Sequence, residues 1–213
     1  MKYSTDIPRG IFGYIESVGE KESSFNWQAK KENGLILIRV FEENKKFLNY
    51  CRGNGDTQEW RIVVENKHDI TAERNGNTLH IYGTRFGESY DTTVEIDDRP
   101  WYQPLSFSLG NFLDSDKQKI SFWVIRADKI EVIALTAEKM GTETLMFDEK
   151  EVFTQKVEIR AEGFYSKFWS ASYWYRKSDN LFLRYKSVHG VPGTAATTVK
   201  LVTVPDSYVK TNS

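Results

Sequence analysis

Cysteine and histidine are scarce in this chain. Cys51 is its one cysteine, and a single thiol excludes both an internal disulfide and a zinc site built from several thiolates. The histidines, His68, His80 and His189, lie in separate segments, and none is followed by a second metal ligand at the spacing of a metal site. The sequence therefore predicts no metal and no cofactor.

An excess of either charge is also absent. Lys and Arg total 29, Asp and Glu total 30, and the two signs are interspersed along the chain. A nucleic-acid-binding domain usually carries a basic excess or stripe, so this composition argues against a nucleic-acid partner. No apolar run is long enough to span a bilayer, and the first residues lack the hydrophobic core of a signal peptide. We expect no transmembrane segment, and we expect the periplasm or cell envelope if a leader has been removed, and otherwise the cytoplasm.

Motifs for covalent or phosphate chemistry are missing as well. The chain has no Gly-x-Ser-x-Gly nucleophile elbow, no Gly-Lys-Ser/Thr phosphate loop and no dinucleotide fingerprint after a strand. The glycine-rich stretch 190–193 joins two predicted strands and is interpreted as a hairpin connection. The paired carboxylates Glu42-Glu43 and Asp97-Asp98 lie at predicted strand ends, where adjacent side chains point to opposite faces. We predict no catalytic residues.

Aromatic residues, by contrast, are abundant. The chain contains 13 Phe, 11 Tyr and 6 Trp against a hydrophobic content of 39%. Each ring buries a large apolar area, so we expect an aromatic core. From Phe25 onward, alternating segments are separated by turn signals such as Asn33-Gly34, at a spacing of roughly eight to twelve residues. This spacing is typical of a continuous antiparallel meander.

The fold class predicted from this pattern is all-β, a curled antiparallel sheet of about nine to twelve strands that forms a half barrel. Curling is expected because a long meander must protect its two edge strands from pairing with other chains. One helical insert, near residues 100–113, is predicted to lie against the concave face. Its evidence is the helical spacing of four apolar residues, Trp101, Leu105, Leu109 and Phe112.

We expect one domain over residues 1–213. Glycines and a proline interrupt any periodicity in residues 1–22, which we interpret as a loosely attached lead-in. The half barrel is expected over residues 23–204, followed by a tail at residues 205–213.

The segment from Gly163 to Val202 is especially rich in aromatics and is interpreted as three antiparallel strands. Alternation puts large rings on both of its faces. One face must belong to the core, and the other either packs beneath the insert near Trp101 or lines an apolar ligand cavity. The two sets of rings are Tyr165, Trp169, Tyr173 and Tyr175 on one face and Phe164, Phe168 and Trp174 on the other.

The order of elements in the later half is that of a known family. It runs from a strand at Thr92 through WYQPLSFSLGNFL, ISFWVIR, KIEVIALTAE and FTQKVEIRAE to SASYWYRKSDNLFLRYKSVHG. The last hairpin has a strand with Trp174, a polar turn at Ser178-Asp179-Asn180 and a returning strand with Arg184. Over residues 25–202 the chain resembles an uncharacterised bacterial family of secreted half-barrel proteins, related in fold to the lipoprotein localisation carriers. The resemblance implies a fold and an envelope location, and no reaction.

The function predicted from these observations is non-enzymatic binding of an apolar or amphipathic small molecule, such as a lipid or acyl chain, in the concave face. Burial of such a chain needs only apolar area, which contributes about 25 cal/mol per Å². The predicted ligand-binding residues are Trp101, Leu105, Leu109, Phe112, Trp123, Tyr165, Trp169, Tyr173 and Tyr175.

Two alternatives stay open. One is a cavity enzyme of unknown reaction with Tyr173, Arg176, His80 or Arg184 as polar participants, which requires some of these side chains to meet in the cavity. The other is a structural or assembly protein that pairs an edge strand with a partner.

Overall fold

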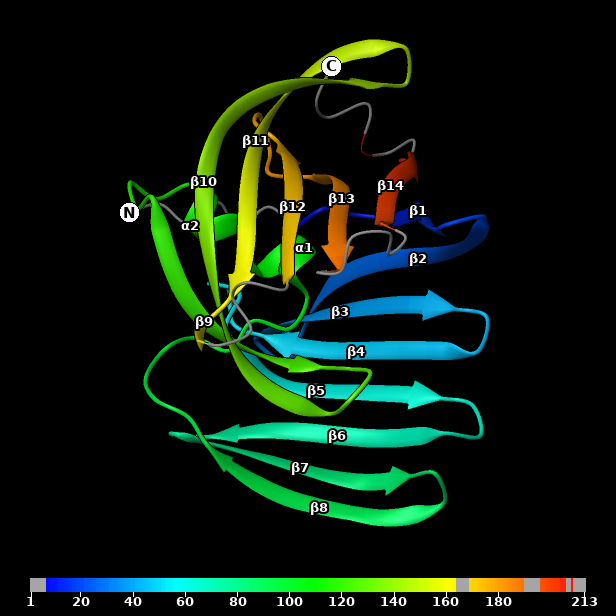
Figure 1. Cartoon of the computed structure of the whole chain (residues 1–213), viewed down its shortest axis with the longest axis vertical. Coiled ribbons are helices and arrows are strands. Elements are labelled where there is room, and N and C mark those ends of the chain that lie inside the picture. The colour runs from blue at the N-terminus through cyan, green and yellow to red at the C-terminus, as the bar shows by residue number, and fades with distance from the viewer. Residues whose placement is uncertain (1–6, 164–168, 190–195, 206–207, 209–213) are drawn as a thin grey trace.

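The computed structural model describes residues 7–163, 169–189, 196–205 and 208. Its strands form one antiparallel sheet of 14 strands, which curls without closing into a barrel (Figure 1). The two edge strands of this sheet are β8 and β9.

The strands follow one another along the chain with short connections. The first eight are β1 (Ile11–Val18), β2 (Lys21–Glu32), β3 (Leu35–Glu42), β4 (Lys45–Cys51), β5 (Thr57–Val64), β6 (His68–Asn75), β7 (Thr78–Arg85) and β8 (Glu88–Glu95). The insert contains the short helices α1 (Leu105–Ser108) and α2 (Gly110–Leu113). The remaining strands are β9 (Lys119–Arg126), β10 (Glu131–Phe147), β11 (Lys150–Ala161), β12 (Trp169–Arg176), β13 (Phe182–His189) and β14 (Thr197–Thr203).

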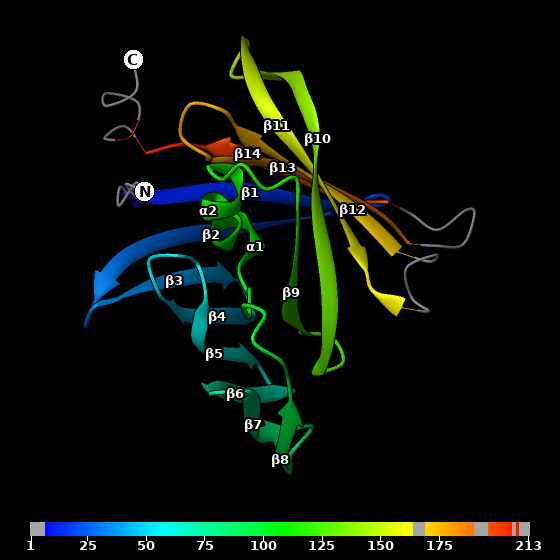
Figure 2. The same cartoon turned by 90° about the vertical axis from the view of Figure 1, so that its left-hand side faces the viewer.

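The sheet consists of two meanders that meet at β1. This strand pairs with β2 on one side and with β14 on the other. The first meander runs outward from β1 to β8, and the second runs from β9 back to β14. The chain between the two edges carries α1 and α2 through the hollow of the sheet (Figure 2). A single connection therefore links both edges across the concave face.

The predicted all-β half barrel with one short helical insert on its concave face is confirmed. The sheet holds 14 strands, more than the expected number of about nine to twelve. The expectation of a loose lead-in is wrong for residues 11–22, which form β1 and the start of β2. Gly13 interrupts the alternation for a structural reason. At a register shift against β14, a Cβ added to it would lie 3.1 Å from the Thr203 Cβ.

Buried apolar side chains form two clusters. The insert core surrounds α1 and α2 and includes Leu109 and Phe112 together with Trp27 and Phe122 from the two meanders. The wing core lies on β5–β8, which we call the wing, and its members are Trp60, Ile62, Ile70, Ala72, Leu79, Ile81, Ile96, Trp101, Ile125 and Ile130. Strand β9 contributes neighbouring residues to both clusters, so both of its faces are covered.

Candidate functional site

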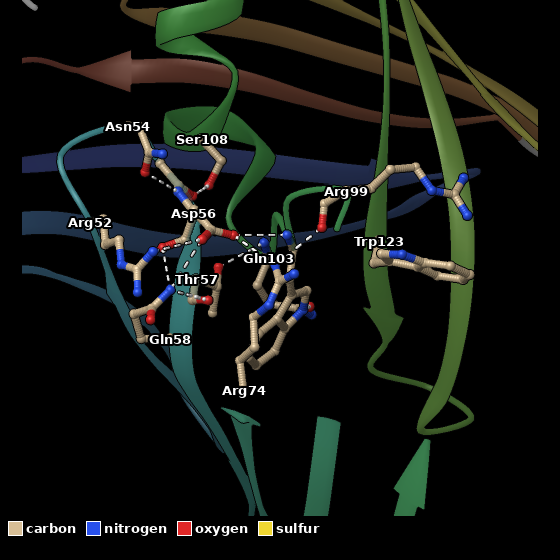
Figure 3. A network of polar contacts seen from close by, with 12 residues as sticks. Arg52, Asn54, Asp56, Thr57, Gln58, Arg74, Arg99, Gln103, Ser108 and Trp123 are labelled. Atoms are coloured by element: carbon tan, nitrogen blue, oxygen red, sulfur yellow. Dashed lines mark hydrogen bonds and ion pairs between the residues drawn. The ribbon is translucent and has the colours of Figure 1, made fainter. Parts of the chain in front are cut away.

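The start of the insert, residues 99–103, is a strap that is bonded to β5 and its preceding turn (Figure 3). The Asp56 carboxylate accepts hydrogen bonds from the Trp101 backbone N–H at 2.9 Å and from Arg74 Nη1 at 3.2 Å. Arg74 Nη1 also donates to the backbone oxygen of Arg99 at 3.1 Å. The Thr57 N–H donates to the Trp101 carbonyl at 2.7 Å. A nearly buried ion pair thus fixes the strap on the wing.

The same strap is bonded to the edge strand β9. The Tyr102 N–H donates to the Trp123 carbonyl, and the Trp123 N–H donates to the Pro100 carbonyl, each at 2.9 Å. The Gln103 amide bonds the Ile125 backbone twice: Nε2 donates to its oxygen at 2.7 Å and Oε1 accepts from its N–H at 3.0 Å. The strap therefore joins strands of the two meanders that do not pair with each other.

Helices α1 and α2 follow the strap and are held by fewer polar contacts. Ser108 Oγ donates to the Gly55 carbonyl at 2.8 Å, and Lys139 Nζ donates to the Leu113 carbonyl at 3.1 Å. Gly55 has φ +83°, and a Cβ there would lie 2.6 Å from the Ser108 backbone oxygen, so glycine is required for this close approach. Burial of the Lys139 ammonium lowers its pKa, although Asp114 and Asp116 oppose the shift.

Aromatic rings cover the concave face beside α1, and we call this set the aromatic wall. Its ring centroids lie 5.2 Å apart for Tyr14 and Phe25, 5.5 Å for Tyr14 and Phe182, and 4.9 Å for Tyr173 and Tyr185. Such separations are those of favourable aromatic pairs. The wall consists of Tyr14 on β1, Phe25 on β2, Tyr173 and Tyr175 on β12, and Phe182 and Tyr185 on β13.

The hydroxyls of the wall tie it to neighbouring backbone. Tyr14 donates to the Phe182 carbonyl at 3.1 Å, and Tyr175 donates to the Leu105 carbonyl at 2.8 Å. Burial raises the pKa of both phenols, so they stay protonated and keep donating. Phe25 and Tyr185 are partly exposed, in contrast to the buried Tyr14 and Tyr175. The wall therefore has one side fixed under α1 and one side open to solvent.

A small cleft lies where the insert meets the wall. Its volume is about 80 Å³, and Tyr14, Phe182, Trp27 and Phe107 are among the residues that line it. A pocket for a drug-sized ligand occupies about 300–1,000 Å³. The cleft in this conformation is therefore too small for an acyl chain, because α1 and α2 fill the space beside it.

The structure divides the predicted ligand-binding residues between two places. Leu105, Leu109 and Phe112 lie in or against the insert core, and Tyr173 and Tyr175 belong to the aromatic wall beside it. Trp101 lies in the wing core, and Trp123 packs against that core. The ring of Trp123 lies under the Arg99 guanidinium at 4.3 Å, away from the wall. Tyr165 and the side chain of Trp169 lie outside the described part of the chain.

The two faces of the aromatic segment have different surroundings. Tyr173 and Tyr175 face the concave side, where the Tyr175 hydroxyl reaches α1. Trp174 faces the opposite side, with Lys156 and Arg184 each 5.3 Å from its ring centre and its indole N–H donating to Glu143 at 2.7 Å. Phe164 and Phe168 are outside the described residues. Alternation in the sequence therefore assigned these rings to two faces of the strand, and the structure shows that Tyr173 and Tyr175 lie on the concave one.

Tyr14 and Phe25 were not among the predicted site residues. The signal for β1 is its alternation of Phe12, Tyr14 and Glu16, which the neighbouring Gly10 and Gly13 obscure. The contact of Tyr14 with Phe182 on β13 depends on the pairing of β1 with β14 and of β14 with β13. No local pattern encodes this long-range pairing.

The residues of the enzyme alternative are not brought together. His80 Nε2 lies 3.0 Å from Asp91 Oδ1 between β7 and β8, whereas Arg176 forms an ion pair with Asp179 at 2.6 Å. Arg184 packs on Trp174, on the face opposite Tyr173. Within the described ranges, no group of three or more His, Cys, Asp or Glu is placed to hold a metal ion. No helix in the same ranges has the length and apolarity needed to cross a membrane.

Comparison with known proteins gives a match of fold. No protein-family model matches the chain, and no curated protein matches it significantly. A β-barrel-like protein of the domain of unknown function DUF1849 from Brucella abortus matches with a TM-score of 0.62 and 10% identity, over 92% of this chain and 97% of that chain. This likeness confirms, at the level of the fold, the expected resemblance to uncharacterised half-barrel proteins.

Two further structures match more weakly. The hypothetical lipoprotein YmcC from Escherichia coli (K12) gives a TM-score of 0.39 and 10% identity, over 94% of this chain and 90% of that chain. A LolA superfamily protein from Nitrosomonas europaea gives 0.31 and 8%, over 96% and 92%. These two superpositions are too loose to support an argument about this chain.

Proposed function

We propose that this protein binds an apolar or amphipathic small molecule, such as a lipid or acyl chain, between the concave face of the sheet and the helical insert. The observation that carries the proposal is the aromatic wall, whose partly exposed rings Phe25 and Tyr185 continue into buried rings beside α1. Ligand pockets are typically apolar and aromatic with a small number of polar groups. The wall has this composition, since it consists of six aromatic rings with a small number of phenol hydroxyls.

Binding of a full chain requires the insert to move, because the cleft has a volume of only about 80 Å³. The polar contacts of α1 are Ser108 with Gly55 and Tyr175 with Leu105, and each such hydrogen bond contributes about 0.5–1.5 kcal/mol net. A ligand that buries about 200 Å² of apolar area gains about 5 kcal/mol. The gain exceeds the loss of these two hydrogen bonds, and the ligand must also replace the apolar contacts of Leu105 and Phe107 with the insert core, while the strap keeps the insert attached.

The proposal is tested by titrating dodecanol, decanol and octanol into the protein while following tryptophan fluorescence, with native mass spectrometry to count bound molecules. We expect saturable binding that tightens with chain length. The Phe25→Ala variant should bind about tenfold more weakly, which corresponds to 1.4 kcal/mol. Phe86→Ala is the matched control, because this ring in the turn between β7 and β8 is 64% exposed and lies on the wing, far from the wall in the sheet order. Absence of saturable binding in the unmodified protein would reject the proposal.

A second candidate function is assembly through an edge strand, and one observation favours it. Strand β9 pairs with β10 only as far as Glu138, and no described strand continues that pairing along the rest of β10. Met146 and Phe153 on the projecting β10–β11 hairpin are 67% and 65% exposed. An uncovered apolar edge is a template for pairing with a second copy. Light scattering should then report a dimer that Met146→Lys dissociates, and a monomer at all concentrations would reject this candidate.

A further inference from the structure

Glu16 is a charged residue at the open end of the aromatic wall. Its cross-strand partners are Val199 on β14 and Ser23 on β2, and Val199 pairs in turn with Tyr185. Directly opposite residues in an antiparallel sheet project from the same face. Glu16 therefore projects from the concave face, on the same side as Tyr185 and next to the partly exposed part of the wall.

The carboxylate of Glu16 has no cation of its own. Among the described residues it makes no hydrogen bond or ion pair, and the charged groups that act on it are Glu42 and Lys45. Lys45 Nζ is paired with Glu42 at 3.2 Å and lies 4.6 Å from the centre of the Phe47 ring. Burial and the proximity of Glu42 raise the pKa of the Glu16 carboxyl. Glu16, Glu42 and Lys45 together thus carry one more negative than positive charge, and the next cation on this face is Lys21, opposite Val18.

A positively charged group fits this corner better than a neutral or negative one. Ammonium groups are attracted to the faces of Phe and Tyr rings at about 6 Å or less from the ring centre. A carboxylate beside such rings adds a charge-assisted attraction in a partly dehydrated place. An anionic head group would instead be repelled by Glu16 and Glu42.

The aromatic wall also indicates where the alkyl chain of such a ligand would lie. Tyr14 lies two residues before Glu16 on the same face and lines the cleft beside the insert. A head group at Glu16 would therefore leave its alkyl chain along the rings, with its end at the cleft and α1.

We propose that the ligand of the concave face is a cationic amphiphile, an alkylamine or alkylammonium compound whose head group binds between Glu16 and the rings of Phe25 and Tyr185. The inference rests on the proposed function, because it assigns the chemical class of ligand for the same site. It goes beyond that function in predicting a preference for one sign of charge.

The test compares ligands of equal chain length: dodecyltrimethylammonium, dodecanol and dodecyl sulfate, each below its micelle concentration and at low salt. Isothermal titration calorimetry measures their affinities for the unmodified protein and for Glu16→Gln. We expect the ammonium compound to bind about tenfold more tightly than the alcohol, a difference of 1.4 kcal/mol. Glu16→Gln should reduce this ratio to about twofold or less without changing the affinity for the alcohol. Glu22→Gln on the opposite face of β2 is the matched control and should leave the ratio unchanged.

Other outcomes would overturn the inference alone or the inference together with the proposed function. Equal affinities for the alcohol and the ammonium compound would overturn the inference and leave the proposed function standing. Tighter binding of dodecyl sulfate, or an ammonium preference that survives in Glu16→Gln, would also overturn it. Failure of all three compounds to bind would reject both the inference and the proposed function.

Discussion

The wing core and the aromatic wall beside the insert core differ in how exposed their rings are. In the wing core, Trp60, Ile81 and Trp101 are each 0–1% exposed, and the strap adds a backbone connection across them. Beside the insert core, the wall has partly exposed rings and a cleft, and the Trp27 indole N–H is buried there without a hydrogen-bond partner among the described residues. A filled core maintains shape, whereas partly exposed rings beside a cleft are suited to accept a ligand.

The strap, which lies over the wing core, and the helices α1 and α2, which lie beside the wall, differ in how firmly they are held. Residues 99–103 are fixed by the Asp56–Arg74 pair and by backbone bonds to two strands. Helices α1 and α2 have four residues each, and their polar ties to the sheet are single hydrogen bonds. The comparison predicts that substitutions at the strap and wing core will cost stability, whereas substitutions at the insert will mainly change ligand affinity.

The largest decrease in the free energy of unfolding is expected from Trp101→Ala. This side chain is fully buried in the wing core, and a Trp-to-Ala substitution in a core typically costs about 3–5 kcal/mol. Urea denaturation monitored by circular dichroism measures the loss. Phe153→Ala, at an exposed ring, should change the free energy of unfolding by less than about 0.5 kcal/mol. A loss below about 1 kcal/mol for Trp101→Ala would show that the wing core is not the stable part of the molecule.

A smaller decrease in the free energy of unfolding is expected from Asp56→Asn. This change removes the charge that pairs with Arg74 in a nearly buried position and weakens the bond to the Trp101 N–H, at a cost of about 2 kcal/mol. Asp69→Asn is the control, because Asp69 pairs with Arg61 at 2.7 Å on an exposed surface, where a salt bridge contributes about 0–1 kcal/mol. Equal losses from the two substitutions in the same urea experiment would contradict the special role of the strap.

On the insert side, Tyr175→Phe should separate stability from affinity. It deletes the hydroxyl that donates to the Leu105 carbonyl, which costs about 1 kcal/mol. Because α1 is then easier to displace, dodecanol should bind more tightly. Tyr82→Phe removes a bond from a Tyr hydroxyl to Glu73 on a strand of the wing and should leave the affinity unchanged. Weaker dodecanol binding in Tyr175→Phe would mean that the ligand does not displace the insert.

The smallest expected effect is a change with pH in the contribution of the Glu16 carboxyl to stability. Because the folded protein raises the pKa of this carboxyl above 4.5, its contribution to stability is greatest below that pH and is lost as the pH rises through the folded pKa. Glu16→Gln does not titrate, so its stability relative to the unmodified protein should be higher at about pH 7 than at about pH 4, by less than about 1 kcal/mol. Thermal melts at the two pH values measure the difference. A relative stability that does not change with pH would remove the argument that this carboxylate lacks a cation.

Alternation and turn residues predicted most of the fold. They gave the antiparallel meander, the insert at residues 100–113 and the strands of the aromatic segment, because these features depend on local patterns. The strand β1 was missed since Gly13, which permits close approach to Thr203, breaks the local alternation. Its place at the centre of the sheet depends on pairing with β14, far away in the sequence.

The candidate site was predicted only in part, for a related reason. The rings of β12 are visible in the sequence, but their neighbours Tyr14, Phe25 and Glu16 come from β1 and β2 through the long-range pairing of β1 with β14. Trp123 was assigned to the cavity because alternation cannot show that β9 is covered on both faces. The volume that remains beside the insert depends on side-chain packing, which composition does not determine.

Photo-crosslinking locates the ligand directly and so tests whether it binds in the concave face. A dodecyl ligand with a diazirine at the end of its chain is bound, irradiated and located by peptide mass spectrometry. We expect the label to attach to residues of the aromatic wall and of α1, with Phe107 and Tyr14 at the cleft as the expected sites. Labels confined to the exposed β10–β11 hairpin, near Met146 and Phe153, would contradict binding in the concave face.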